Sequence, residues 1–286
     1  MVRGRRSDKV VLGGDLEIRR PGFGALHLTG PGAWGEPEDR DAAKALLRRV
    51  VALGVNLIDT ADSYGPDVSE RLIAEALFPY PDDLVIATKG GKVRAGPSRE
   101  IWPANGRPEH LRAACEGSLQ RLRLERIDLY QLHAVDPAVP IEESIGALVE
   151  LQVEGKIRHI GVSNVSVEEL ARAKAAARIV SVQNRYSLAD RSSEDVVRVC
   201  EREGLVFFAW QPLDLGALTT KPKLARVAEA RHATAAQLAV AWLINRSPLL
   251  VPIPGTGSLT HLEENVAGAN LRLTAAEAAA LAEIGG

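Results

Sequence analysis

The chain of 286 residues has little of several features that mark special classes of protein. It contains two cysteines, one methionine and only 4% aromatic residues. Cys115 and Cys200 fall on separate predicted helices, and neither belongs to a CxxC motif. This pattern argues against a disulfide framework and favours buried free thiols in a reducing cytoplasm. We expect no metal site.

Charge and hydropathy exclude further classes. The net charge of −2 and the pI of about 6.3 predict no nucleic acid partner. No run approaches the roughly 18 apolar residues of a membrane span, so we expect no membrane partner either. The basic start, residues 1–9, precedes no long apolar segment and therefore predicts a frayed terminus, not a signal peptide. We expect a cytoplasmic protein. The sequence does not determine its oligomeric state, and a monomer is compatible with it.

What the chain does contain is a repeated alternation of strand and helix patterns, in a sequence that is 46% hydrophobic. The predicted strands are short and almost continuously apolar, as fully buried parallel strands are. They cover residues 23–28, 56–59, 84–89, 126–133, 159–163, 179–184, 205–210 and 249–254. A possible hairpin, residues 9–12 and 16–19, comes before them.

Helix patterns fill the gaps between these strands. Those over residues 41–53, 140–154 and 193–203 each stop at a glycine, which tolerates the left-handed conformation after a last helical turn. Ser166–Glu169 and Thr274–Glu277 have the form of capping boxes. Eight strand–helix pairs predict one (β/α)8 TIM barrel domain over residues 1–286, with a short N-terminal β-hairpin. The long connections 90–107 and 211–223 are expected to build the binding site.

One motif points elsewhere. Gly30-Pro-Gly-Ala-Trp-Gly35 matches the GxGxxG dinucleotide fingerprint, and Asp59 follows at a suitable distance. In a Rossmann fold the third glycine lies inside a helix that opens at the turn, whereas here Gly35 is followed by Glu-Pro-Glu-Asp. Eight strand–helix units also exceed a Rossmann half, so we reject this interpretation.

Four polar residues lie at or near predicted strand ends. Asp59, Lys89 and His133 each close an apolar run, and Tyr64 follows Asp59 by five positions. In a parallel barrel these ends meet at the floor of the active-site pocket, where such groups can transfer protons. Taken singly, the Asp could cap a loop, and the Tyr or the His could be a packed core group. A buried lysine is costly and harder to dismiss.

Several segments together resemble the aldo-keto reductases. They are Leu57-Ile-Asp-Thr-Ala-Asp-Ser-Tyr-Gly65, Ala87-Thr-Lys89, Leu129-Tyr-Gln-Leu-His133, Gly155-Lys-Ile-Arg-His-Ile-Gly-Val-Ser-Asn164, Val182-Gln-Asn184 and Ile253-Pro-Gly-Thr-Gly257 with Glu263-Glu-Asn265. The resemblance implies a TIM barrel that binds NADPH across the strand C-termini and reduces aldehydes and ketones to alcohols. Gly30–Pro37 and Ala76–Asp83 are most similar to bacterial pyridoxal-reductase-like members.

The chemistry of this family assigns roles to the four residues. Carbonyl reduction needs a hydride for carbon and a proton for oxygen, without a metal if a strong donor holds the developing alkoxide. We predict that Tyr64 donates the proton and that the Lys89 ammonium lowers the pKa of its phenol. Asp59 would be the ion partner of Lys89. His133 would hydrogen-bond the carbonyl oxygen and orient the substrate.

The same resemblance implies the cofactor contacts. Ser163, Asn164 and Gln183 would hold the nicotinamide carboxamide, and Trp210, where tyrosine is commoner, would stack on the ring. The pyrophosphate would pass the segment that contains Gln211, Pro212, Leu213 and Gly216. The adenosine end would meet Thr256, Ser258, His261, Glu264 and Asn265, and Ile253 and Pro254 would also contact the cofactor. Capping roles for Ser163 and Asn164, and a core role for Trp210, are the alternatives.

The adenosine end departs from the family pattern. Gly255 and His261 stand where a lysine and an arginine are usual, and histidine is only partly charged near pH 7. Backbone amides at the start of a helix, residues 255–258, can still bind phosphate. We therefore expect NADPH, with NADH as the alternative.

The substrate is expected to be a small-molecule carbonyl compound. Trp34 and Trp102, together with Trp210, are predicted at the pocket mouth and favour a flat or apolar substrate, although tryptophans also anchor loops. Pyridoxal-like aldehydes, sugar or polyketide carbonyls and reactive aldehydes all fit. Two alternative functions stay open: a cofactor-sensing regulatory subunit on the same fold, and a Schiff-base aldolase that uses Lys89.

Overall fold

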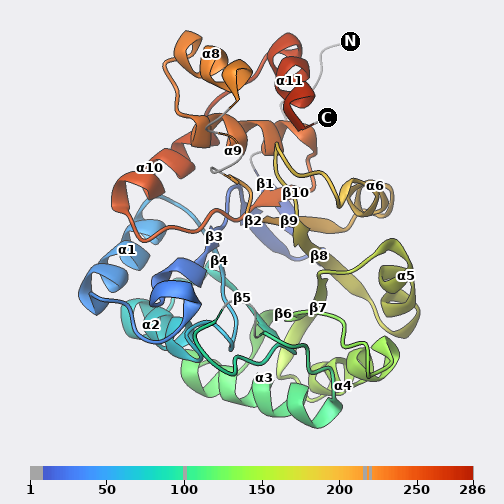
Figure 1. Ribbon diagram of the computed structural model, residues 1–286. Coiled ribbons are helices and arrows are strands. Elements are labelled where there is room, and N and C mark those ends of the chain that lie inside the picture. Colours follow the sequence, from blue (N-terminus) through green and yellow to red (C-terminus); the bar gives the residue numbers. More distant parts are fainter. Residues whose placement is uncertain (1–8, 99–101, 215–217, 219–220, 286) are drawn as a thin grey trace.

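The computed structural model describes residues 9–98, 102–214, 218 and 221–285 (Figure 1). Its strands are β1 (Lys9–Leu12), β2 (Leu16–Arg19), β3 (Phe23–Gly24), β4 (Leu57–Asp59), β5 (Val85–Gly90), β6 (Ile127–Leu132), β7 (Ile157–Ser163), β8 (Ile179–Arg185), β9 (Val206–Trp210) and β10 (Leu250–Pro252). Its α-helices are α1 (Arg40–Ala52), α2 (Val68–Leu77), α3 (Pro108–Leu122), α4 (Ile141–Val153), α5 (Val167–Ala176), α6 (Glu194–Glu203), α8 (Pro222–Ala230), α9 (Ala235–Arg246), α10 (Leu259–Gly268) and α11 (Ala275–Ala282). Short 3-10 helices are η1 (Ala25–Leu28), η2 (Pro31–Ala33) and η3 (Glu283–Gly285).

The strands β3 to β10 form a parallel barrel. Within the described residues they make one eight-stranded sheet in the chain order β3 to β10. Its two outer strands also meet, because Gly22 N donates to Pro252 O over 3.0 Å and Gly24 N donates to Pro254 O over 3.2 Å. Helices surround the strands in Figure 1. The predicted (β/α)8 fold with an N-terminal hairpin is confirmed.

One predicted strand is wrong in its second half. The run 23–28 is β3 only as far as Gly24, and Ala25–Leu28 form η1. A side chain at Gly24 would stand 2.8 Å from the Ile253 carbonyl oxygen, so this glycine permits the close approach that joins β3 to the last strand. The chain then turns away from the sheet and carries His27 to the mouth of the barrel. The other predicted strands differ from the structure by two residues or fewer at each end.

The helix ends follow the predicted chemistry. Both predicted capping boxes, at Ser166 before α5 and at Thr274 before α11, are present. Gly54 and Gly204 adopt left-handed conformations, with φ of 85° and 72°, just after α1 and α6. The GxGxxG segment opens no α-helix, because it contains only the short 3-10 helix η2 and α1 begins at Arg40 with Asp39 as its N-cap. The rejection of a dinucleotide fingerprint there is therefore confirmed.

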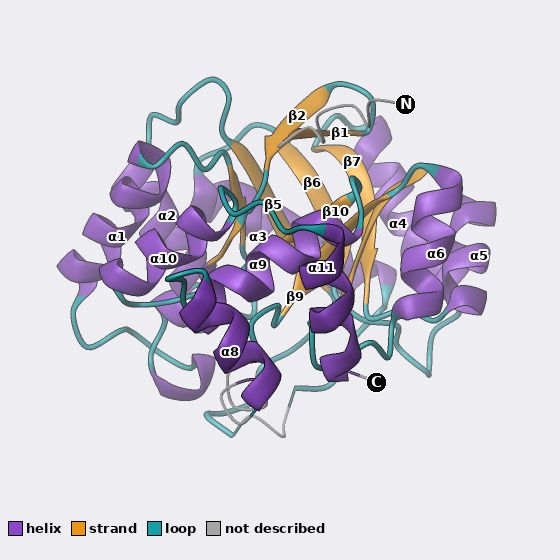
Figure 2. Ribbon diagram, turned by 90° about the horizontal axis from the view of Figure 1, so that it is seen from above, coloured by secondary structure: helices purple, strands orange, loops and turns teal. Residues whose placement is uncertain are grey.

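The hairpin β1–β2 closes one end of the barrel. Val10, Leu12, Leu16 and Ile18 are buried in one cluster with inward-facing strand residues such as Val206. Figure 2 shows the hairpin across one end of the strands. Its turn is tied to β7 by Asp15, which accepts from the Arg158 guanidinium at 2.7 Å and contacts His159 Nε2 at 2.6 Å.

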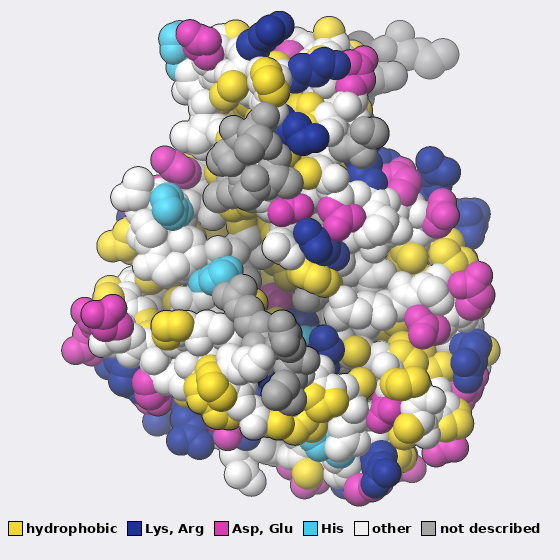
Figure 3. All heavy atoms as spheres, in the orientation of Figure 1, with side chains coloured by type: hydrophobic (Ala, Val, Ile, Leu, Met, Phe, Trp, Pro, Cys, Tyr) yellow, Lys and Arg dark blue, Asp and Glu magenta, His cyan; other side chains and the backbone are white. Residues whose placement is uncertain are grey.

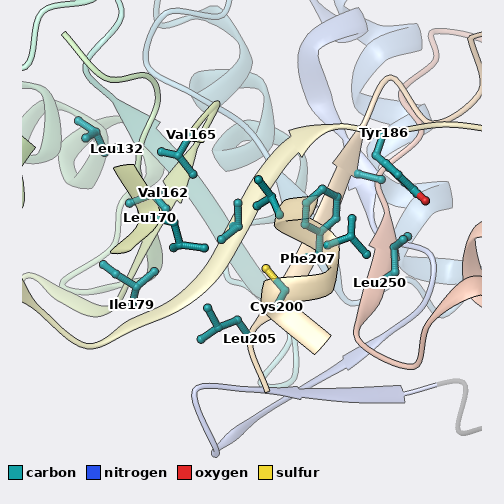
Figure 4. Close-up of a cluster of buried hydrophobic side chains, with 14 of the residues drawn as sticks. Leu132, Val162, Val165, Leu170, Ile179, Tyr186, Cys200, Leu205, Phe207 and Leu250 are labelled. Carbon is teal, nitrogen blue, oxygen red and sulfur yellow. The ribbon is translucent and has the colours of Figure 1, made fainter. Parts of the chain in front are cut away.

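A second apolar layer lies between the strands and the helices. Leu132, Val162, Leu170, Phe207 and Leu250 belong to its largest cluster, and Figure 4 shows several of these side chains. Cys115 and Cys200 are free and buried in this layer, as predicted. In the part of the chain that the structure describes, no helix is long and apolar enough to cross a membrane.

Candidate active site

The four polar residues come together at the C-terminal ends of the strands. Asp59 ends β4, Lys89 lies in β5, His133 follows β6 directly, and Tyr64 lies in the loop between β4 and α2. Asp59, Tyr64 and His133 border a cavity of about 570 Å³. Lys89 is fully buried beneath it. Ligand pockets commonly have volumes of roughly 300 to 1,000 Å³, so a small molecule fits here.

The Lys89 ammonium is the centre of the site. Its Nζ donates to Asp59 Oδ2 at 2.6 Å, to the Thr60 carbonyl oxygen at 2.9 Å and to Tyr64 Oη at 3.2 Å. These three acceptors use all three N–H bonds of an ammonium group. The lysine therefore joins the acid to the phenol in one geometry.

Two amide side chains hold the other oxygen of Asp59. Gln183 Nε2 donates to Oδ1 at 2.8 Å and Gln131 Nε2 donates to it at 3.3 Å. Gln131 was not among the predicted site residues. Its position was a usable signal, because a polar residue two positions before His133 in a buried strand faces the same side of the sheet.

The charge states of the pair follow from its contacts. Desolvation lowers the pKa of Lys89, but the attraction of Asp59 and Tyr64 and the hydrogen bonds to both together outweigh it, and the net pKa lies above the usual value. Lys89 is therefore a cation at neutral pH. A buried charge of this kind is stable only because it is paired and hydrogen-bonded.

The pKa of Tyr64 corrects a prediction. Burial raises the pKa of its phenol above the usual value near 10, and the Lys89 ammonium offsets only part of this rise. The predicted net lowering is wrong, because desolvation of the phenolate outweighs one nearby cation that Asp59 already neutralises. Tyr64 is protonated at neutral pH and able to donate.

His133 is a neutral imidazole in this setting. Burial, the Lys89 charge and then the Lys92 charge hold its pKa well below the usual value. Its Nδ1 lies 3.4 Å from Ser63 Oγ. Its ring meets Tyr64 and Trp102 edge-on, at centroid distances of 5.9 Å and 5.7 Å. The neutral imidazole of His133 therefore packs against two aromatic side chains.

The cavity also brings together nine of the residues expected to contact the cofactor. Its lining includes Ser163, Asn164, Gln183, Trp210, Gln211, Pro212, Leu213, Ile253 and Pro254. Trp210 Nε1 donates to Asn164 Oδ1 at 3.0 Å, so the indole is held in place at the end of β9. Gly216 lies outside the described residues.

The residues expected at the adenosine end lie just beyond the cavity. Thr256, Ser258, His261, Glu264 and Asn265 do not line it and lie in α10 and the turn before it. Ser258 is the N-cap of α10 and accepts from His261 N at 3.4 Å. Asn265 Oδ1 is buried without a hydrogen-bond partner among the described residues. Such an orphaned acceptor needs a donor that the described residues do not supply.

The tryptophans are placed differently from one another. Trp102 lines the cavity, with its ring 6.1 Å from that of Tyr64. Trp34 does not line it, and its ring lies 5.6 Å from the Arg94 guanidinium carbon. Lining residues that the sequence did not indicate include Gly24, His27, Lys92 and Asp214. Among the described residues, no group of three or more His, Cys, Asp or Glu is arranged to hold a metal ion.

A buried Lys–Asp pair, a protonated tyrosine and a neutral histidine around one pocket can bind an oxygen atom on which negative charge develops and can protonate it. Comparison with known proteins identifies the class. The sequence model of the family described as "Aldo/keto reductase family" matches residues 22–285. The chain belongs to the aldo/keto reductase family, whose members are NAD(P)H-dependent oxidoreductases.

Individual relatives support this. An uncharacterized oxidoreductase of Schizosaccharomyces pombe is 45% identical over 274 residues, which cover 95% of this chain and 88% of that protein. The pyridoxine 4-dehydrogenase of Escherichia coli is 40% identical, over 91% of this chain and 93% of that protein. The structure of an aldo-keto reductase from Klebsiella pneumoniae in complex with NADPH superimposes with a TM-score of 0.81 at 29% identity, over 96% of this chain and 93% of that one.

Proposed function

We propose that this protein reduces an aldehyde or ketone to an alcohol with NADPH, and that Tyr64 supplies the proton. The observation that carries the proposal is the contact of Tyr64 Oη with the Lys89 ammonium at the edge of the cavity. The cofactor, when bound, supplies the hydride to the carbonyl carbon. The chain's own residues must then bind the carbonyl oxygen, stabilise its growing negative charge and protonate it.

Tyr64 and Lys89 act as one donor. The phenol is protonated at neutral pH and can hydrogen-bond the carbonyl oxygen before the reaction. As the proton leaves Oη, negative charge develops on the phenolate, 3.2 Å from a cation that is already in place. The cation needs no reorganisation at that moment, which is the main source of electrostatic catalysis.

His133 and Trp102 fix the orientation of the carbonyl group. A neutral imidazole can donate a hydrogen bond to the same oxygen without adding a charge that would compete with Lys89. The two rings meet edge-on and form a wall of the cavity with Tyr64. This wall favours flat, aromatic carbonyl compounds.

The residues present fit a nicotinamide dinucleotide. Ser163, Asn164 and Gln183 would hold the carboxamide, and Trp210 would cover the ring from the end of β9. The backbone at Gln211–Leu213 would follow the pyrophosphate. The orphaned acceptor Asn265 Oδ1 suits the amino group of adenine, and the N-terminus of α10 offers backbone amides for a phosphate. The Klebsiella relative was solved with NADPH, which supports this cofactor over NADH.

For the substrate we propose a pyridoxal-like aldehyde. The enzyme of Escherichia coli that is 40% identical is named for the interconversion at position 4 of pyridoxine. Pyridoxal is a flat heteroaromatic aldehyde, which suits the wall of Tyr64, Trp102 and His133.

A Schiff-base aldolase does not fit this site. A lysine nucleophile must be neutral and able to reach the carbonyl carbon. The Lys89 ammonium is fully buried, its three N–H bonds are used, and Asp59 raises its pKa. These contacts describe a fixed cation.

The test is oxidation of NADPH, followed at 340 nm, over a panel of aldehydes that includes pyridoxal. We expect turnover by the wild type and a loss of about 100- to 10,000-fold in kcat for Tyr64→Phe, with an unchanged melting temperature. Normal turnover by Tyr64→Phe would refute the donor. Absence of wild-type turnover on the whole panel would overturn the proposal and favour a cofactor-sensing binding role.

A further inference from the structure

Lys92 is a cation in the cavity that the proposed reaction does not use. It follows β5 by two residues, and its half-buried side chain lines the cavity with Tyr64 and His133. Its Nζ stands 5.3 Å from the centre of the Trp102 ring. That ring is 6.1 Å from the Tyr64 ring and 5.7 Å from the His133 ring. One indole therefore borders both the ammonium and the place of the chemistry.

No carboxylate among the described residues balances the charge of Lys92. Its ammonium makes no ion pair in that part of the chain, and its contact with Trp102 is a cation–π contact. Desolvation lowers the pKa of Lys92. Its charge also helps to lower the pKa of His133. A half-buried ammonium without a counter-charge gains from an anion that enters the cavity.

The two acidic residues that line the cavity, Asp59 and Asp214, do not balance the charge of Lys92. Asp59 is neutralised by Lys89 at 2.6 Å, and Asp214 pairs with Arg185 at 3.2 Å. The Arg94 guanidinium lies over the Trp102 ring as well, at 4.7 Å.

The position of Lys92 separates it from the proposed path of the cofactor. In the order of the sheet, β5 stands four strands from β9, after which the pyrophosphate segment follows. In a closed barrel of eight strands, this is the opposite side of the mouth (Figure 1). An anion at Lys92 therefore belongs to the substrate side.

We propose that Lys92 is a specificity residue that selects carbonyl compounds with an anionic substituent, a carboxylate or a phosphate, a few bonds from the carbonyl carbon. This inference rests on the proposed carbonyl reduction and deepens it. Tyr64 and His133 would hold the carbonyl oxygen, Trp102 would cover the body of the substrate, and the Lys92 ammonium would pair with the anion.

The test compares matched substrates that differ in charge. One pair is 4-carboxybenzaldehyde and methyl 4-formylbenzoate, and the other is pyridoxal 5′-phosphate and pyridoxal. For each pair, the ratio of kcat/KM for the anionic to the neutral member is measured with NADPH. We expect a ratio of about ten or more in the wild type for at least one pair, since a charge-assisted contact is typically worth about tenfold or more.

Substitution assigns this preference to one side chain. Lys92→Met should bring the ratio to about one or below, and Lys92→Arg should retain most of it. A general loss of activity affects both members of a pair and cancels. Lys174→Met, which removes a surface lysine paired with Glu203, is the control for net charge and should keep the wild-type ratio. The pair that responds identifies the anion as carboxylate or phosphate.

The results separate this inference from the proposed function. Turnover of both members with a wild-type ratio near one, or a ratio unchanged in Lys92→Met, would overturn the anion site and leave the reductase intact. If no aldehyde is turned over, binding decides. Tighter binding of 4-(hydroxymethyl)benzoate than of its methyl ester, followed by tryptophan fluorescence and lost in Lys92→Met, supports the site. Equal binding overturns it.

Discussion

The two ends of the barrel are built on the same strands, but one is filled with apolar side chains and the other with polar and charged ones. At one end Leu57, Val85 and Leu129 face the hairpin in an apolar cluster. Two positions further along β4 and β6, Asp59 and Gln131 join the hydrogen-bond network of Lys89. Alternate residues of a strand face the same side of a sheet, so these are successive layers of one interior.

The difference teaches where this molecule is stabilised and where it is reactive. The layer at the hairpin end gains stability from the burial of hydrocarbon. The layer at the open end holds a buried ion pair, whose desolvation roughly cancels its attraction. Its value lies in the fixed cation beside Tyr64. Three experiments sharpen or break this division.

The largest effect is expected at Lys89. Lys89→Met leaves the Asp59 carboxylate buried with two amide donors but no cation, which should reduce the free energy of unfolding by about 3–5 kcal/mol and remove measurable carbonyl reduction. Denaturant titration and NADPH oxidation measure the two effects. The double variant Asp59→Asn with Lys89→Met should recover most of the stability and none of the activity. Recovery of activity would contradict the role of the cation.

A smaller effect is expected at the closed end. Ile18 is fully buried in the hairpin cluster, so Ile18→Ala should lower the free energy of unfolding by about 3 kcal/mol through the cavity that it leaves. The value of kcat/KM should stay within about twofold of the wild type, because the chemistry lies in a different layer. Val11→Ala, at a side chain that is 53% exposed in the same strand, is the control and should cost less than about 0.5 kcal/mol. A large loss of activity in Ile18→Ala would show that the two layers are coupled.

The smallest effect concerns pH. In the proposed reaction Tyr64 can donate a proton only while it is protonated, and burial raises its pKa above the usual value near 10. The pKa of His133 is depressed, so its imidazole is already neutral at pH 7. We therefore expect kcat/KM for reduction to stay constant from about pH 7 to 9 and to fall only above about pH 10. A fall centred between pH 7 and 9 would mean that the attraction of Lys89 outweighs desolvation. The residual activity of Tyr64→Phe should lack the alkaline fall.

Much of the fold could be predicted because each buried strand is apolar over its whole length. The runs that became β5 and β9 are bounded by polar or glycine residues, and their predicted ends differ from the observed ones by one residue. The strand at residues 23–28 failed because Ala25–Leu28 is as apolar as a strand. Periodicity alone cannot tell whether such a short apolar run forms a strand or, as here, a 3-10 helix at the mouth of the barrel.

The local sequence determined which residues are candidates for the proposed chemistry and on which strand ends they stand. Asp59, Lys89 and His133 close apolar runs, and closing a parallel barrel brings such ends to one face. The tertiary structure alone decided the electrostatics. Desolvation raises the pKa of Tyr64 by more than Lys89 lowers it, and Gln131 and Gln183 both donate to Asp59. Lys92 lines the cavity without a carboxylate partner among the described residues. The physical reason is that pKa values and ion pairs depend on distance and burial. The distances and the burial at this site arise only when strands that are far apart in the chain pack together.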